Sequence, residues 1–80
     1  MYIEITIDVS HYESGDSFDL RLSNYHTIKQ LVDLVWQLKK FQTPPRQGYW
    51  VRISNKRVVL PGNERLVDAG VLTGDRIEIL

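Results

Sequence analysis

The feature that most constrains this fold is a single stripe of apolar residues at helical spacing. Most of the other patterned segments alternate with period two instead. The apolar residues recur every three or four positions, as they do on the buried face of an amphipathic helix. They are Ile28, Leu31, Val32, Val35 and Leu38. The spacing predicts one helix from about residue 27 to about residue 41. This helix must cover the apolar face of a sheet, since the sequence offers no second element to do so.

The residues on either side of the stripe are typical of helix ends. With Thr27 as the N-cap, Gln30 occupies the third helical position, which is a capping-box pattern. Lys39 lies near the predicted end, where a cation suits the helix dipole. Pro44 and Pro45 then prevent continuation of the helix.

Four segments alternate apolar and polar residues and predict strands, at 2–9, 18–22, 49–53 and 76–80, and the apolar run 58–60 predicts a further short strand. The polar stretch 10–16, which contains Gly15, predicts a hairpin connection with a bulge or open turn. The resulting order β-β-α-β-β-β predicts an α+β fold, a mixed sheet with one main helix on one face. This is the β-grasp, or ubiquitin-like, roll, and we expect residues 1–80 to form a single domain.

Composition excludes several functional classes. The ten basic and ten acidic side chains give a formal net charge of zero, which disfavours broad attraction to nucleic acid or to anionic membranes. Cysteine is absent, so no disulfide or thiolate chemistry is available, and a reducing cytoplasm is expected. The N-terminus lacks the pattern of a signal peptide, and no window reaches the ~20 apolar residues of a membrane span.

The polar residues form no pattern that predicts an enzyme, a metal site or a cofactor. His11 and His26 lie outside any ligand spacing, so we expect solvated or capping histidines. No serine lies in a Gly-x-Ser-x-Gly setting, and no glycine-rich phosphate loop occurs. A modest basic cluster near two aromatic residues could bind single-stranded nucleic acid, but the acidic residues elsewhere cancel its field. That cluster is Arg46, Arg52, Lys56 and Arg57.

The sequence resembles ubiquitin-like proteins, and more closely the YukD/EsaB family. The general resemblance rests on Thr27-Ile28, on Pro44-Pro45 and on the turn from Leu66 to Val71. The closer resemblance rests on Tyr2-Ile3-x-Ile5-Thr6, Asp19-Leu20-Arg21-Leu22, Pro44-Pro45-Arg46, Trp50-Val51-Arg52, Asn55-Lys56 and the segment from Gly74 to Leu80. Members of that family are stand-alone ubiquitin-like proteins associated with type VII (ESX/WXG100) secretion in Gram-positive bacteria. The resemblance therefore implies a cytosolic accessory or regulatory protein whose partner belongs to the secretion machinery or regulates it.

Two departures from ubiquitin bear on mechanism. Covalent modifiers and sulfur carriers, the alternative function, need a flexible tail that ends in Gly-Gly, whereas here a strand pattern runs to Leu80. We therefore expect no conjugation. Arg52 occupies the position of the isoleucine that ubiquitin presents to its partners, so ubiquitin receptors should not recognise this chain.

The candidate partner-binding residues lie on the outward face predicted for the sheet. If Val51 and Ile53 face the core, Trp50 faces outward, and aromatic residues beside Arg are enriched at binding hot spots. The predicted partner-binding set is Tyr2, Trp50, Arg52, Arg76 and Leu80. The alternative is that Trp50 only covers the edge of the sheet or stacks on a neighbouring arginine.

A second apolar region lies on the flanks of the helix. Trp36 is expected at the boundary of the core, since it lies about 80° from Ile28 around the helix axis. Leu34 and Phe41 could extend an exposed apolar strip on the opposite flank and support weak self-association.

Overall fold

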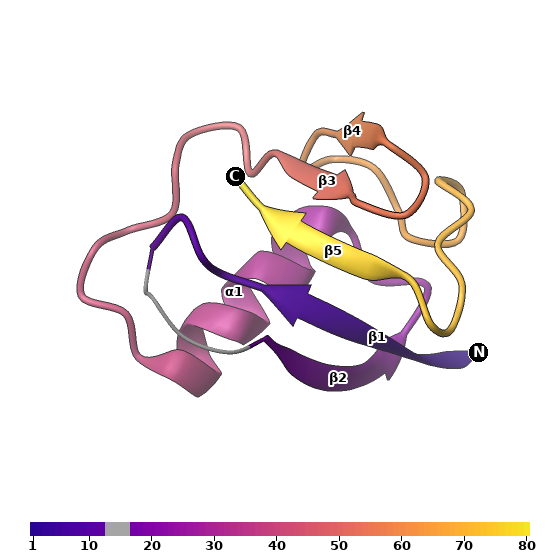
Figure 1. Cartoon of the computed structure of the whole chain (residues 1–80), viewed down its shortest axis with the longest axis horizontal. Helices are drawn as coiled ribbons and strands as arrows, with labels where there is room; N and C mark the ends of the chain where they lie inside the picture. The colour runs from indigo at the N-terminus through magenta and orange to yellow at the C-terminus, as the bar shows by residue number, and fades with distance from the viewer. Residues whose placement is uncertain (13–16) are drawn as a thin grey trace.

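The computed structural model describes residues 1–12 and 17–80, and over these residues the chain forms one five-stranded sheet and one helix (Figure 1). The elements are β1 (Tyr2–Asp8), β2 (Phe18–Ser23), α1 (Ile28–Lys39), β3 (Val51–Ile53), β4 (Val58–Leu60) and β5 (Arg76–Ile79). The strand order is β2-β1-β5-β3-β4, with β1 and β5 parallel and the other neighbours antiparallel. The predicted order of elements and the α+β, mixed-sheet architecture are confirmed.

The start of α1 follows the predicted capping box. The Thr27 hydroxyl accepts a 3.1 Å hydrogen bond from the N–H of Gln30, and the Gln30 side chain accepts a 2.9 Å bond from the N–H of Thr27. At the other end, Lys40 takes a left-handed conformation (φ 55°) and its N–H donates to the carbonyl of Trp36. The helix therefore ends at Lys39, slightly before the predicted boundary at about residue 41.

The core lies between α1 and the inner face of the sheet. Ile5, Ile7 and Ile77 on the central strands are essentially inaccessible to solvent, as predicted from their alternation. Four residues of the helical stripe are equally buried. They are Ile28, Leu31, Val32 and Val35.

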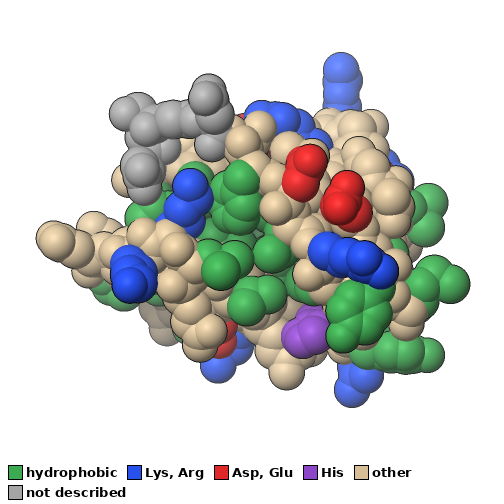
Figure 2. All heavy atoms as spheres, turned by 90° about the horizontal axis from the view of Figure 1, so that it is seen from below, with side chains coloured by type: hydrophobic (Ala, Val, Ile, Leu, Met, Phe, Trp, Pro, Cys, Tyr) green, Lys and Arg blue, Asp and Glu red, His purple; other side chains and the backbone are tan. Residues whose placement is uncertain are grey.

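Leu38 is an exception to the predicted stripe, since 57% of its surface is exposed. The last turn of α1 extends past the strands in Figure 1, so a residue there has no sheet beneath it even when its helical angle is favourable. Viewed from below, onto β2 and α1, hydrophobic side chains reach the surface of the molecule (Figure 2). The prediction that Leu38 belongs to the core was wrong.

β3 is shorter than the alternation at 49–53 predicted. Tyr49 has φ 54°, a left-handed backbone that cannot continue a strand, so β3 begins at Val51. Tyr49 still packs against the core, as its apolar position suggested. The N–H of Tyr49 bonds the carbonyl of Arg46, which closes the turn expected around residues 46–48.

An aromatic cluster joins the segment after β1, the C-terminal half of α1 and the segment after α1. The ring centroids of Tyr12 and Trp36 are 4.7 Å apart, and those of Trp36 and Phe41 are 4.8 Å apart. Trp36 is half-buried, as predicted, and its Nε1–H donates to the carbonyl of Thr43. Leu34 and Phe41 also pack against the core, so the exposed strip proposed from them is not present, and self-association remains a prediction without it. Gly15, expected in a bulge or open turn, lies outside the described residues.

Candidate partner-binding site

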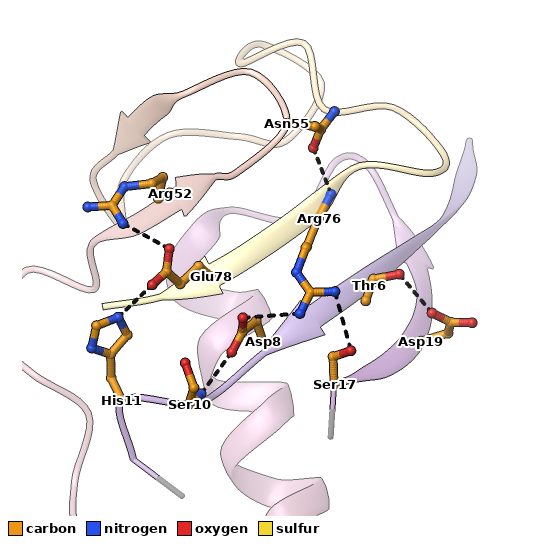
Figure 3. Close-up of polar contacts among 10 residues, drawn as sticks. All are labelled: Thr6, Asp8, Ser10, His11, Ser17, Asp19, Arg52, Asn55, Arg76 and Glu78. Carbon is orange, nitrogen blue, oxygen red and sulfur yellow. Dashed lines mark hydrogen bonds and ion pairs between the residues drawn. The ribbon is translucent and has the colours of Figure 1, made fainter. Parts of the chain in front are cut away.

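The outer face of the sheet carries a network of charged and polar side chains (Figure 3). Cross-strand pairing places Arg52 of β3 opposite Glu78 of β5, and Arg52 Nη1 lies 2.9 Å from Glu78 Oε1. The other carboxylate oxygen of Glu78 lies 2.6 Å from His11 Nε2. Glu78 thus joins β3, β5 and the segment after β1.

A second ion pair lies on the same face, at the start of β5. Arg76 Nη2 lies 3.2 Å from Asp8 Oδ2, and the N–H of Ser10 donates a 2.9 Å hydrogen bond to Asp8 Oδ1. The bond from Ser10 and the Arg76 guanidinium outweigh burial and hold the pKa of Asp8 below its ordinary value. The charges at Arg52 and Arg76 are therefore already met by carboxylates of the same chain.

Tyr2 does not lie near Trp50, so this part of the predicted grouping was wrong. β1 runs parallel to β5, with Thr6 opposite Arg76, so the start of β1 and the end of β5 lie at opposite ends of the sheet. Figure 1 shows the N-terminus and the C-terminus at these opposite ends. At ~3.3 Å per residue, the register puts Tyr2 roughly 25 Å from the level of Leu80 along the strands. Tyr2 is 66% exposed there, and its ring packs beneath Arg21.

Trp50 and Leu80 are brought together as predicted. The N–H of Leu80 donates a 3.1 Å hydrogen bond to the carbonyl of Trp50, just beyond the register that pairs Val51 with Ile79. Trp50 is 47% exposed. Its indole does not lie over Arg52, because it leans back over Gly48, past the start of β3. The Trp50 side chain therefore lies at one end of the sheet, whereas Arg52 and Arg76 lie on the outer face of the sheet.

The indole of Trp50 forms one wall of an open hollow of about 550 Å³. The hollow lies between the first turn of α1, the segment before β3 and the segment after β4. We call it the Trp50 hollow, and it is lined by Thr27, Lys29, Gly48, Tyr49, Trp50, Pro61, Gly62 and Asn63.

Backbone hydrogen bonds hold these three segments in place. The N–H of Gly62 donates to the carbonyl of Gly48, and the N–H of Lys29 donates to the carbonyl of Gly62. The first turn of α1 thereby satisfies one of its free N–H groups with the segment after β4. The floor of the Trp50 hollow is therefore fixed by the fold.

At both glycines of the Trp50 hollow, another residue lies so close to the backbone that a side chain would not fit. A Cβ at Gly48, which has φ 91°, would lie 2.5 Å from Trp50 Nε1, and a Cβ at Gly62 would lie 2.7 Å from the Cβ of Tyr49. Tyr49 itself carries the left-handed strain that non-glycine residues rarely adopt. Such strain concentrates at functional sites in proteins.

The sequence alone did not reveal the Trp50 hollow or the pairing of His11 with Glu78. Each is formed by segments that lie far apart in the chain. No local sequence pattern predicts the strand register that brings these segments together. The one available signal was the sequence Gly48-Tyr49-Trp50, in which a glycine immediately precedes two aromatic residues.

Three of the four basic residues proposed as a nucleic-acid cluster have separate partners, Arg57 being the exception among the described residues. Lys56 pairs with Asp75, Arg52 pairs with Glu78, and the Arg46 guanidinium lies over the ring of Tyr12. They do not form one patch of unpaired positive charge.

Comparison with known proteins places the chain in a family. The family model described as "WXG100 protein secretion system (Wss), protein YukD" matches residues 2–79. The ESX secretion system protein YukD of Bacillus subtilis (strain 168) is 51% identical over 80 residues, which cover 100% of both chains. The chain belongs to the YukD family. The family description and the relative's name both refer to a secretion system protein, and neither names an enzyme.

Solved structures confirm the ubiquitin-like fold of this YukD family member. The ubiquitin of Caldiarchaeum subterraneum matches with a TM-score of 0.74 and 22% identity, over 99% of this chain and 91% of that one. The C-terminal ubiquitin-like domain of mouse tubulin-specific chaperone e matches with a TM-score of 0.69 and 15% identity, over 98% of this chain and 84% of that one. At these identities the likeness concerns the fold.

Within 1–12 and 17–80, no helix has the length and apolar character that crossing a membrane requires. The same residues contain no group of three or more histidine, aspartate or glutamate side chains placed to hold a metal ion.

Proposed function

We propose that this chain is a non-conjugating, ubiquitin-like accessory or regulatory protein of a Gram-positive type VII (ESX) secretion system. Its family membership and its 51% identity to an ESX secretion system protein support the pathway. In this proposal it acts in the cytoplasm by docking on a protein partner, a cytosolic part of the secretion machinery or a regulator of it.

The half-exposed indole of Trp50 is the observation that carries the docking role. A large aromatic side chain beside an open hollow offers apolar area to a partner, and tryptophan is enriched among residues that dominate binding energy. Arg52 and Leu80 adjoin Trp50 through the β3–β5 register and complete the proposed surface. Arg76 lies farther along the same face, and Tyr2 would have to contact a partner separately.

The backbone of Leu80 supports the non-conjugating part of the proposal. Its N–H bonds the carbonyl of Trp50, and its carbonyl accepts a 2.6 Å hydrogen bond from the Tyr12 hydroxyl. A residue tied on both sides cannot thread into the site of an activating enzyme without breaking these bonds. Intact-mass measurement and blots of cell lysate should show only the free chain, and a ladder of adducts through the C-terminus would favour the covalent modifier instead.

A secretion assay tests the docking role. Deleting the gene should abolish or strongly reduce export of a WXG100 protein, and the wild-type gene should restore it. Trp50→Ala should fold normally by circular dichroism yet fail to restore export. Tyr25→Ala is the matched control, since Tyr25 is a 62% exposed aromatic residue outside the proposed surface and should restore export fully. Normal export with Trp50→Ala would overturn the docking role of this residue.

A further inference from the structure

The charged groups of the outer sheet face and those of the Trp50 hollow differ in one respect. On the sheet face, Arg52 and Arg76 each have a carboxylate partner. At the Trp50 hollow, Lys29 is the one charged residue of the lining, and no carboxylate in the described part of the chain lies within ion-pair distance of it. The cation of the hollow is therefore available to a partner.

The ammonium of Lys29 lies beside an aromatic ring. Its ammonium lies 5.5 Å from the centroid of the Tyr49 ring, within the range of a cation–π interaction. Its backbone is anchored by the bond to Gly62 at the start of α1. The ammonium therefore lies at the wall of the hollow, against the ring of Tyr49.

The indole N–H of Trp50, another polar group of the lining, is also a donor. Trp50 Nε1–H has no hydrogen-bond acceptor among residues 1–12 and 17–80, whereas the indole of Trp36 donates to Thr43. Indole N–H and ammonium groups donate and do not accept. Most of the lining surface is apolar, with contributions from Tyr49, Trp50 and Pro61, while Thr27 and Asn63 add a hydroxyl and an amide group.

We infer that the Trp50 hollow binds a short acidic segment of a partner protein, in which one aromatic or large aliphatic side chain is flanked by aspartate or glutamate. The apolar side chain would lie against the Trp50 indole and Pro61, and a carboxylate would pair with Lys29. A volume of about 550 Å³ falls within the ~300–1,000 Å³ typical of ligand pockets. This inference rests on the proposed docking function and adds the chemistry of the partner.

Selection from a displayed library of random short peptides tests the inference directly. Peptides enriched on the wild-type chain should carry an aromatic or large aliphatic residue next to acidic ones. Lys29→Glu should reverse the selected charge from acidic to basic, because the lining then offers an anion. Lys39→Glu makes the same change at the other end of α1 and should leave the selected pattern unchanged.

The best enriched peptide should then be synthesised and titrated into the ¹⁵N-labelled chain. The indole N–H resonance of Trp50 and the amides of Gly48 and Gly62 should shift saturably. Trp50→Ala should weaken binding about tenfold or more, as truncation of a hot-spot aromatic does. Shifts confined to Arg52 and Glu78, no acidic enrichment, or equal selection by wild type and Lys29→Glu would each overturn the inference.

The secretion assay separates failure of this inference from failure of the proposed function. If deletion and Trp50→Ala abolish export while no acidic peptide is selected, the docking function stands and the acidic partner segment is refuted. If deletion leaves export intact, the proposed function fails whatever the peptides show.

Discussion

The hydroxyl of Tyr12 donates a 2.6 Å hydrogen bond to the carbonyl oxygen of Leu80. The same hydroxyl accepts a 3.0 Å bond from the N–H of Arg46, so one side chain joins the segment after β1, the residue after β5 and the segment after α1. These segments frame the end of the sheet where Trp50 lies. The position of Leu80 beside Trp50 therefore depends partly on a phenol from a remote part of the sequence.

Tyr12→Phe should destabilise the fold by about 1–2 kcal/mol, because it removes two hydrogen bonds and keeps the ring that packs on Trp36. Urea unfolding should show a lower midpoint at an unchanged slope. The control is Tyr2→Phe, whose ring is 66% exposed and which should change the free energy of unfolding by no more than about 0.5 kcal/mol. Equal effects of the two substitutions would contradict this role of the Tyr12 hydroxyl.

The lowered pKa of Asp75 leads us to expect that part of the free energy of unfolding is lost at acid pH. Burial alone would raise the pKa of Asp75, but hydrogen bonds from the N–H of Leu72, from Lys56 and from Asn55 outweigh burial and lower it. A lowered folded-state pKa contributes stability that is fully present above the unfolded-state value of about 3.9. That stability is lost as the pH falls through the lower folded-state pKa.

Asp75→Asn should therefore cost about 2 kcal/mol of unfolding free energy at pH 7. The difference from wild type should shrink as the pH falls below about 4. Urea unfolding over a series of pH values checks both statements. Asp68→Asn, an exposed aspartate in the preceding turn, is the control and should show neither effect. A difference that stays constant down to the acid limit would rule out the carboxylate as the cause.

Local periodicity was enough to predict the helix, its capping box and the buried isoleucines of β1, because these depend on neighbours within a few residues. It failed where the answer depends on how elements are placed against one another. Outward alternation predicts that Tyr2 and Trp50 share a face and lie close together, but the parallel β1–β5 register separates them. The Trp50 hollow was missed since it needs the Gly62–Gly48 bond between remote segments.

Substitutions of Leu38 and Val35 compare an exposed and a buried residue of the same helical stripe. Val35 is fully buried, so Val35→Ala should cost about 2–3 kcal/mol through lost apolar burial and the cavity left behind. Leu38→Ala removes more atoms, yet it should cost less than about 0.5 kcal/mol, because 57% of Leu38 is already exposed. Chemical denaturation of both variants measures the difference. A larger loss for Leu38→Ala than for Val35→Ala would restore Leu38 to the core.

Gly48→Ala should disturb the Trp50 hollow more than a backbone penalty alone explains. The new methyl group would meet the indole at 2.5 Å and force it away from its position over residue 48. Gly74→Ala is the matched control, since Gly74 has a similar φ of 94° but open space around its Cβ position. Its cost should be that of left-handed strain, about 1–2 kcal/mol. Gly48→Ala should cost more and should also shift the indole N–H resonance of Trp50, whereas Gly74→Ala should leave that resonance in place. If both variants leave the Trp50 resonance unchanged, the indole is not seated on Gly48 in solution.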